Sequence, residues 1–193
     1  CVPSWDAFFI QIIEEMIPAD TTLGSLFDGI GVFPLAAQRN GIVPLWASEI
    51  EKAPISITKR RFPAMQHLGD ITKLHGGRIP PVHIITFGSP CQNLSQIGDR
   101  TGLTGVKSGL FYHAIRIIQE MRDASEGQFP IIAVWENVMG SLSSSNGLDF
   151  NAVLSAFQGA EIPMPASGRW ANAGMVRGQR TDIAWRLMDA QYW

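Results

Sequence analysis

The sequence is poor in cysteine, in excess positive charge and in long apolar runs, and each of these absences excludes a class of protein. Its 193 residues contain two cysteines, Cys1 and Cys91, too few for a disulfide framework or a multi-cysteine zinc site. No apolar stretch approaches the roughly 18 to 20 uncharged residues that a membrane helix needs. The formal net charge is −2, so composition alone gives no sign of the basic face that nucleic-acid binders usually carry. We therefore expect a cytoplasmic protein without a metal site, in a reducing compartment, with Cys91 as a free thiol.

The length and the two ends predict the domain organisation. A chain of 193 residues with 46% hydrophobic and 17% charged residues fits one well-filled domain. It begins with cysteine, and a predicted helix over 181–191 stops with no strand to follow, so we expect a fragment of a longer protein. Residues 5–17 carry one apolar stripe at helical spacing. We predict that residues 1–21 are an N-terminal extension and that 22–193 form the main domain.

From Thr22 onward, apolar strand-like runs alternate with helical patterns, which is typical of a doubly wound, mostly parallel α/β sheet. The predicted strands are 23–27, 43–48, 64–68, 82–87 and 131–135. The predicted helices are 32–40, 52–62 and 109–124, and the predicted loops are 96–108, 140–147 and 159–178. Ligands of such sheets bind outside the carboxyl ends of the strands, so the residues that follow each strand are the candidate site.

The residues after the first three predicted strands indicate a nucleoside pocket. The glycine turn after the first strand consists of Phe27, Asp28, Gly29, Ile30 and Gly31. It lacks the third glycine of the dinucleotide pattern, and the Asp28 carboxylate would repel a diphosphate but suit a sulfonium and an amino group. Glu49 is placed to accept from ribose hydroxyls, and Asp70 from an adenine amino group. The structural alternative makes Phe27 a core residue, Glu49 a solvated helix start and Asp70 an N-cap.

A cysteine follows the fourth predicted strand, in the polar turn 88–95. Pro90 directs the chain out of the sheet, which favours an exposed, reactive Cys91 over the small buried hydrophobe that a free cysteine often is. The last predicted strand delivers Glu136 and Asn137 to the same edge. We therefore expect a thiol and a carboxyl group to face one cleft.

Four motifs in this order, Phe-Asp-Gly-Ile-Gly, Gly-Asp-Ile, Gly-Ser-Pro-Cys-Gln and Glu-Asn-Val, resemble those of the cytosine-5 DNA methyltransferases. The resemblance covers about 22–138 and implies a Rossmann-like class I methyltransferase fold and S-adenosylmethionine as cofactor. It implies that Cys91 adds to carbon 6 of cytosine, while Glu136, with a raised pKa, donates a proton or hydrogen bond to N3. Double-stranded DNA is the implied partner, with the target base flipped out of the helix.

The resemblance also assigns supporting roles. Pro90 fixes the thiol loop, Asn137 braces it, and Gln92 hydrogen bonds to the backbone around it. The further cofactor-binding residues that it implies are Ile50, Ile71, Pro90 and Leu110. The implied DNA-contacting residues, for which a solvated loop is the competing interpretation, are Ser95, Arg100 and Lys107. Val32 stands where many members carry glycine, and Ile50 replaces an aromatic residue that covers adenine, which is expected to weaken stacking.

The resemblance implies that the family's Gln-Arg-Arg segment, its DNA-reading region and its last helix come after Trp193. We therefore expect the chain alone to bind DNA weakly and to be inactive or nearly so, since Arg177, Arg180 and Arg186 look too scattered in sequence to substitute. The expected origin is a bacterial or phage restriction-modification enzyme. Two alternatives stay open: a tRNA methylase with the same motifs, and a non-catalytic domain that binds an adenosyl ligand or a protein partner.

Overall fold

The computed structural model describes residues 20–89 and 109–188, and these fall into two compact units. The first unit comprises 20–88 and Ile117–Trp135, and the second comprises 89, 109–116 and 136–188. The predicted helix over 5–17 and most of the thiol turn lie outside the described residues. Each unit is described by itself below.

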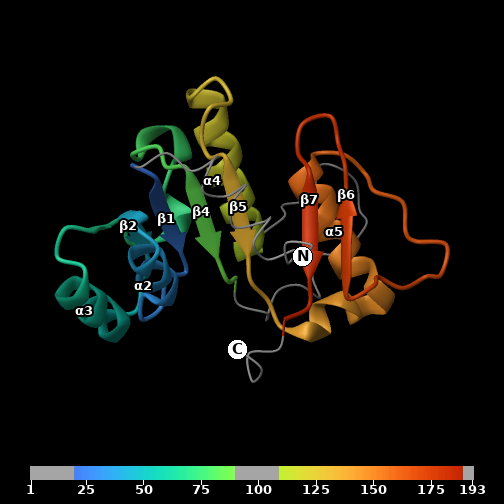
Figure 1. Cartoon of the computed structure of the whole chain (residues 1–193), viewed down its shortest axis with the longest axis horizontal. Coiled ribbons are helices and arrows are strands. Elements are labelled where there is room, and N and C mark those ends of the chain that lie inside the picture. The colour runs from blue at the N-terminus through green and yellow to red at the C-terminus, as the bar shows by residue number, and fades with distance from the viewer. Residues whose placement is uncertain (1–19, 90–108, 189–193) are drawn as a thin grey trace, which may run out of the picture. The chain divides into compact units, whose positions relative to one another are not determined.

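The first unit is built on a five-stranded parallel sheet with the strand order β3-β2-β1-β4-β5 (Figure 1). Its strands are β1 (Thr22–Leu26), β2 (Val43–Ser48), β3 (Gln66–His67), β4 (Ile84–Phe87) and β5 (Ile132–Trp135). Its helices are α2 (Val32–Arg39), α3 (Lys52–Arg61) and, from Ile117 onward, α4 (Leu110–Ala124). The chain turns back between β3 and β4 to pair on the other side of β1, which confirms the doubly wound parallel sheet expected from the sequence.

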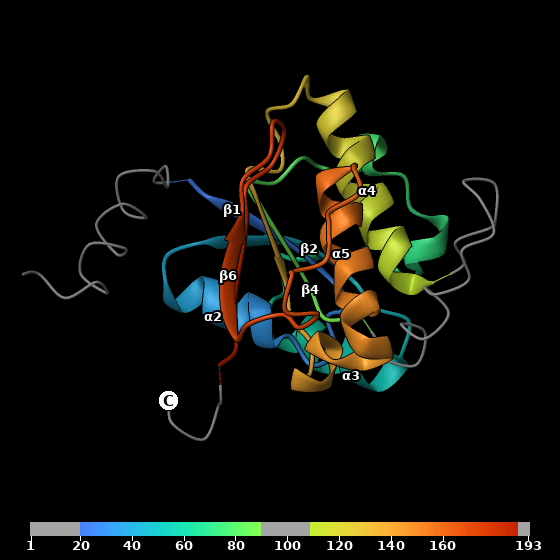
Figure 2. The same ribbon diagram turned by 90° about the vertical axis from the view of Figure 1, so that its right-hand side faces the viewer.

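Helices cover both faces of this sheet, and Figure 2 shows α2 and α4 on opposite sides of the strands. The central strands β1 and β4 are therefore almost wholly buried, which explains their continuous apolar sequence. Helix α2 ends at Arg39, and Gly41 follows the C-cap residue Asn40 with φ 74°, a left-handed conformation that suits glycine after a helix. The strands and helices of this unit lie within a few residues of their predicted ranges.

One close approach inside the sheet requires a glycine. Trp46 of β2 is fully buried, and its indole ring lies against Gly24 of β1, where a Cβ atom would overlap the ring. The indole nitrogen donates to the carbonyl oxygen of Pro80 at 2.9 Å, so the ring cannot swing away without breaking that bond. Gly24 and Trp46 thus fix how β1 and β2 pack.

The second unit contains α5 (Leu148–Gln158) and a two-stranded antiparallel ribbon of β6 (Ala173–Val176) and β7 (Ile183–Arg186). The rings of Phe150, Trp170 and Trp185 meet edge to face, with centroids 5.5 to 5.6 Å apart, and hold the ribbon against α5. Short 3-10 turns (Met139–Leu142 and Ser144–Gly147) precede α5.

Two predictions for the second unit are wrong. The helix predicted over 181–191 is, in its described part, the strand β7, and the loop predicted over 159–178 contains β6. Helix α5 was not predicted. No helix in the described ranges has both the length and the apolar content needed to cross a membrane.

Candidate functional site

The turn after β1 has left-handed backbone at three of its five residues. The φ angles are 53° at Phe27, 55° at Gly29 and 82° at Gly31. A bulky residue in this region costs roughly 1–3 kcal/mol unless the surroundings hold it there, and such strain clusters at functional sites. At Gly31 an added Cβ would lie 2.9 Å from the side chains of Phe62 and Thr58, so only glycine fits this start of α2. The glycine turn predicted from the sequence is therefore a constrained structure rather than a loose loop.

Hydrogen bonds join this turn to the end of β2, and the end of β2 to the end of β3. The Asp28 N–H donates to the Ser48 carbonyl oxygen at 3.1 Å, and the Gly29 N–H donates to Glu49 Oε2 at 2.8 Å. The Ser48 hydroxyl donates to the Gly69 carbonyl oxygen at 2.6 Å. The structure thus brings together the ends of β1, β2 and β3, which carry the three acidic residues selected from the sequence.

Asp28 is the most unusual acid of this site. It is 6% exposed, and neither carboxylate oxygen has a hydrogen-bond partner among the described residues. Burial raises the pKa of Asp28 to about 6; the Ser25 hydroxyl lowers this pKa and the Glu49 carboxylate raises it. The Ser25 oxygen lies near the carboxyl group but not in hydrogen-bond geometry. A buried carboxyl group without a partner is suited to a cationic ligand that supplies the missing interaction.

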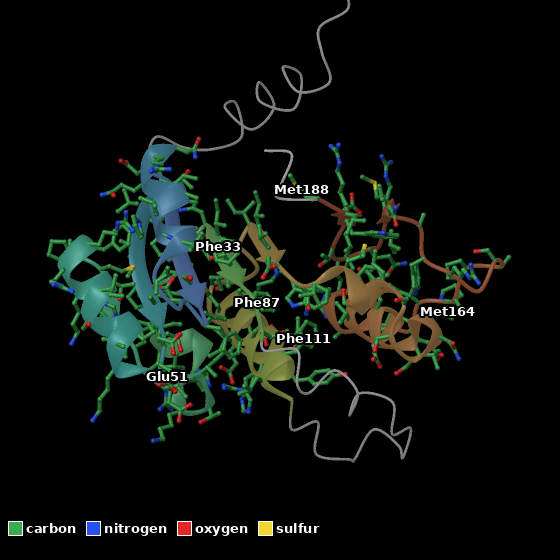
Figure 3. The ribbon with its side chains drawn as sticks, turned by 90° about the horizontal axis from the view of Figure 1, so that it is seen from below. Phe33, Glu51, Phe87, Phe111, Met164 and Met188 are labelled. Atoms are coloured by element: carbon green, nitrogen blue, oxygen red, sulfur yellow. The ribbon has the colours of Figure 1, made fainter. Side chains whose placement is uncertain are left out.

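Glu49 is engaged with backbone rather than free in solvent. Its Oε1 accepts from the N–H groups of Ile50 and Glu51 at 2.7 and 3.0 Å, in addition to the Gly29 bond at Oε2. Glu51, labelled in Figure 3, is the N-cap residue directly before α3. A carboxylate can accept about four hydrogen bonds, so Glu49 keeps capacity for a ligand hydroxyl at Oε2.

The remaining cofactor candidates differ in exposure. Ile50 is 66% exposed beside Glu49, whereas Ile71 is 4% exposed and belongs to the core. Asp70 accepts from the Thr72 N–H at 2.9 Å as N-cap of a short 3-10 turn (Ile71–Lys73). The structural alternative for Asp70 is thus present in the fold, although an N-cap carboxylate still has lone pairs available. Ile30, in the glycine turn, is 53% exposed.

The candidates for chemistry lie at the ends of β4 and β5. Phe87, labelled in Figure 3, pairs with Trp135, so the chain leaves both strands at the same edge of the sheet. Glu136 follows Trp135 directly and is exposed, and the Asn137 side chain accepts from the Val138 N–H at 2.8 Å through Oδ1. Leu110, half-buried, is the first residue of α4.

The other predicted residues lie outside the described residues. They are Pro90, Cys91, Gln92, Ser95, Arg100 and Lys107. Among the residues that the structure does describe, no group of three or more His, Cys, Asp or Glu side chains is placed to hold a metal ion.

Sequence reasoning missed two residues that shape the site, Ser25 and Ser48. Ser25 influences the pKa of Asp28, and Ser48 ties the end of β2 to Gly69. Both are buried polar residues at the end of an apolar strand, and a serine in such a position is the signal that would have indicated a polar contact at the sheet edge.

Comparisons with known proteins agree on one class. The family model described as C-5 cytosine-specific DNA methylase matches residues 21–161. A protein of Escherichia phage P1 named DNA N-6-adenine-methyltransferase is 31% identical over 88% of this chain and 26% of its own length. The type II methyltransferase M1.ScrFI of Lactococcus lactis subsp. cremoris is 34% identical over 77% of this chain and 36% of its own length. The chain thus spans between 26% and 36% of the length of these two relatives.

The fold also matches solved structures. One, described as a DNA modification methyltransferase encoded within an Escherichia coli prophage, superposes with a TM-score of 0.54 at 21% identity. The match covers 81% of this chain and 40% of the solved one. At this level of identity the likeness concerns the fold alone, and it supports the Rossmann-like assignment of the sheet.

Proposed function

The chain belongs to the C-5 cytosine-specific DNA methylase family, and from this premise we propose that it is part of an enzyme that methylates carbon 5 of cytosine in DNA. The observation that carries the proposal is the joined set of strand ends at β1, β2 and β3, with the unpartnered Asp28 carboxyl group among them. The class of reaction, methyl transfer, follows from the family; the target atom and the residue roles are the proposal.

S-adenosylmethionine would supply a methyl group on a sulfonium ion, an adenine ring and a ribose. We propose that Asp28 pairs with the cationic methionine portion, because its buried carboxyl group lacks any other partner among the described residues. Glu49, whose Oε2 already accepts from the Gly29 N–H, would also accept from a ribose hydroxyl, and the exposed Ile50 side chain would pack against adenine. Asp70 and the backbone of Ile71 line the adenine edge, and the turn from Phe27 to Gly31 brings the backbone close to the ligand.

The chemical step is assigned to the thiol and carboxyl motifs. Carbon 5 of cytosine is a poor nucleophile, and addition of the Cys91 sulfur to carbon 6 makes it electron-rich enough to take the methyl group. Glu136 would hold a proton at N3 of the ring during this addition. The methyl transfer would release S-adenosylhomocysteine. A base would then remove the carbon 5 proton, so that the bond between carbon 6 and sulfur breaks, the Cys91 thiolate leaves and the aromatic ring is restored. Asn137 is proposed to position the thiol loop, with Pro90 and Gln92.

Partners and context follow the same proposal. The substrate is double-stranded DNA with the target base flipped out, and the bacterial and phage relatives support a restriction-modification role. Because the chain matches only 26% to 36% of the length of these relatives, we propose that the chain alone is nearly inactive and binds DNA weakly. Methylation of tRNA and a purely binding role are the competing proposals.

Adenine methylation is a second candidate, because the phage P1 relative that matches 88% of this chain is named an N-6-adenine-methyltransferase. The exocyclic amine of adenine is itself a nucleophile and needs no thiol, so the Pro-Cys-Gln motif around Cys91 supports cytosine. That relative is nearly four times as long as the matched region, which leaves room for a separate adenine-specific part.

The product of the reaction decides between these candidates. The full-length gene product would be incubated with duplex DNA, with tRNA as a competing substrate, and with methyl-labelled S-adenosylmethionine. Mass spectrometry of the digested nucleosides is expected to show label in 5-methylcytosine from DNA, and none with the Cys91→Ser variant. Label in N6-methyladenine that survives Cys91→Ser, or label confined to tRNA, would contradict the proposal.

A further inference from the structure

The β6–β7 ribbon has one covered face and one exposed face. Its register pairs Ala173 with Arg186 and Met175 with Ala184, and all four of these residues are exposed. The alternate residues point the other way, and among them Trp185 packs against Phe150 of α5. We call the exposed side the outer face, made of Ala173, Met175, Ala184 and Arg186.

The outer face and the loop that joins the strands carry positive charge. Between residues 162 and 188 there are four arginines and one acid, whereas the whole chain has a net charge of −2. The arginines, all exposed, are Arg169, Arg177, Arg180 and Arg186. None of their guanidinium groups forms an ion pair or hydrogen bond within the described part of the chain. The acid, Asp182, accepts from the Gly178 N–H at 3.3 Å inside the loop.

The antiparallel register places Arg177 and Arg186 on the same side of the ribbon, and Arg180 lies in the loop that joins the two strands. Arg186 lies opposite Ala173 at one end, and Arg177 directly follows β6 at the other. At about 3.4 Å per residue, the two side chains are roughly 13 Å apart along the ribbon. This distance equals about four base-pair steps along the axis of a DNA duplex, since each strand carries one phosphate per roughly 3.4 Å of axis. Figure 3 shows nitrogen-tipped side chains projecting from the β6 and β7 ribbons.

The residues of the outer face that lie between the arginines have small or flexible side chains, so they leave room for DNA to approach the ribbon. Ala173 and Ala184 have small side chains, and Met175, 56% exposed, is flexible and uncharged. A two-stranded ribbon of this kind fits the major groove of DNA, which is about 12 Å wide. One carboxylate lies at the loop end of the outer face: Asp182 is exposed and stands opposite Arg177 where the register of the two strands continues.

We propose that the outer face of the β6–β7 ribbon, with Arg177, Arg180 and Arg186, binds the phosphate backbone of duplex DNA independently of base sequence. The inference rests on the proposed function, since it takes duplex DNA as the substrate. It locates a phosphate-binding surface inside this chain, where the sequence suggests that the arginines are too dispersed to form one.

The test compares two variants that differ from the original chain by the same charge. Binding of a short fluorescent DNA duplex to the chain would be followed by anisotropy between about 50 and 200 mM salt. The ribbon variant carries Arg177→Gln, Arg180→Gln and Arg186→Gln. The control variant carries the same change at three exposed arginines of α2 and α3: Arg39, Arg60 and Arg61.

The ribbon variant is expected to bind DNA about tenfold or more weakly, and its plot of log affinity against log salt becomes shallower by about 0.9 for each phosphate that is no longer neutralised. The control variant is expected to stay within about twofold of the original chain, with an unchanged slope. Equal weakening in both variants, no weakening in either, or no measurable DNA binding by the original chain would overturn the proposal. A ribbon-dependent preference for tRNA over duplex DNA would also overturn it.

Two further measurements cover the case in which the triple variant does not fold and separate DNA binding from the proposed chemistry. If the triple ribbon variant does not fold, each single Arg→Gln variant is expected to reduce the salt slope by about 0.9. Covalent capture on DNA with 5-fluorocytosine at low salt and saturating DNA reports the proposed chemistry separately. If a full-length ribbon variant still captures DNA and binds it as tightly as the original enzyme, the ribbon assignment alone is wrong. If the original enzyme fails to capture DNA, the proposed function is wrong.

Discussion

Replacing Asp28 by asparagine is expected to change the stability of the fold in a way that depends on pH. In the native chain this carboxyl group is 6% exposed, and its two oxygens have no hydrogen-bond partner among the described residues. Burial, its largest cause, raises the pKa of Asp28 from 3.8 to about 6. Folding therefore disfavours the ionised form, and asparagine at the same place never ionises.

The size and sign of the effect follow from linkage. Between the unfolded and folded pKa values the folded chain binds more protons than the unfolded chain, so the free energy of unfolding falls as the pH rises. A carboxyl group whose pKa rises from 3.8 to about 6 loses about 3 kcal/mol of stability once the pH is well above 6. Below pH of about 3 the penalty is absent, because the group is then protonated in both states.

Urea unfolding of the two proteins between about pH 4 and pH 8 measures this directly. The free energy of unfolding of the original chain, minus that of Asp28→Asn, is expected to fall by about 2.4 kcal/mol over this range. The asparagine amide also lacks a partner, so the trend with pH, rather than the difference at any one pH, is the readout. Ser25→Ala removes a group that lowers the Asp28 pKa and is expected to move the fall to higher pH. Parallel pH profiles for the original chain and Asp28→Asn would refute the reasoning.

Three further predictions concern the same unit. The affinity for S-adenosylmethionine, measured by calorimetry, is expected to rise between about pH 5 and 7 and then level off, because a cation pairs with ionised Asp28; a flat profile would contradict this. Gly24→Ala would overlap the buried Trp46 ring and is expected to cost about 1–3 kcal/mol or more in thermal or urea unfolding, while Gly140→Ala, in open space, is expected to be nearly neutral. Glu49→Gln weakens an acceptor shared by three backbone N–H groups, so a loss of about 2 kcal/mol and weaker cofactor binding are expected, and unchanged values of both would contradict its role.

The first unit could be predicted from sequence because its central strands, β1 and β4, are buried on both faces. Continuous apolar runs such as Ile84–Phe87 exclude a surface position, and the turns that follow them carry glycine or acidic residues. The contact network at the strand ends could not be predicted in the same way. The engagement of Glu49 with three backbone N–H groups depends on how close the β1 turn comes to β2, which sequence spacing does not fix.

The secondary structure at the end of the second unit was predicted wrongly because the residues there favour a helix locally, whereas pairing between β6 and β7 favours a strand. The residues of β7, Ile183 to Arg186, include alanine and arginine, which favour helices. Their burial nevertheless alternates, with Ile183 and Trp185 partly covered and Ala184 and Arg186 exposed, which is the period of a strand. Pairing with β6, where Gly174 leaves room for the Trp185 ring, decides the outcome.

Covalent capture of DNA tests the proposed chemistry most directly. The full-length gene product would be mixed with S-adenosylmethionine and duplex DNA in which fluorine replaces the carbon 5 hydrogen of cytosine, so that the thiol cannot be expelled. We expect an adduct that survives denaturation, maps to Cys91 and is absent in the Cys91→Ser variant. A folded, cofactor-binding protein that forms no adduct, or forms one equally well without Cys91, would contradict the proposed mechanism.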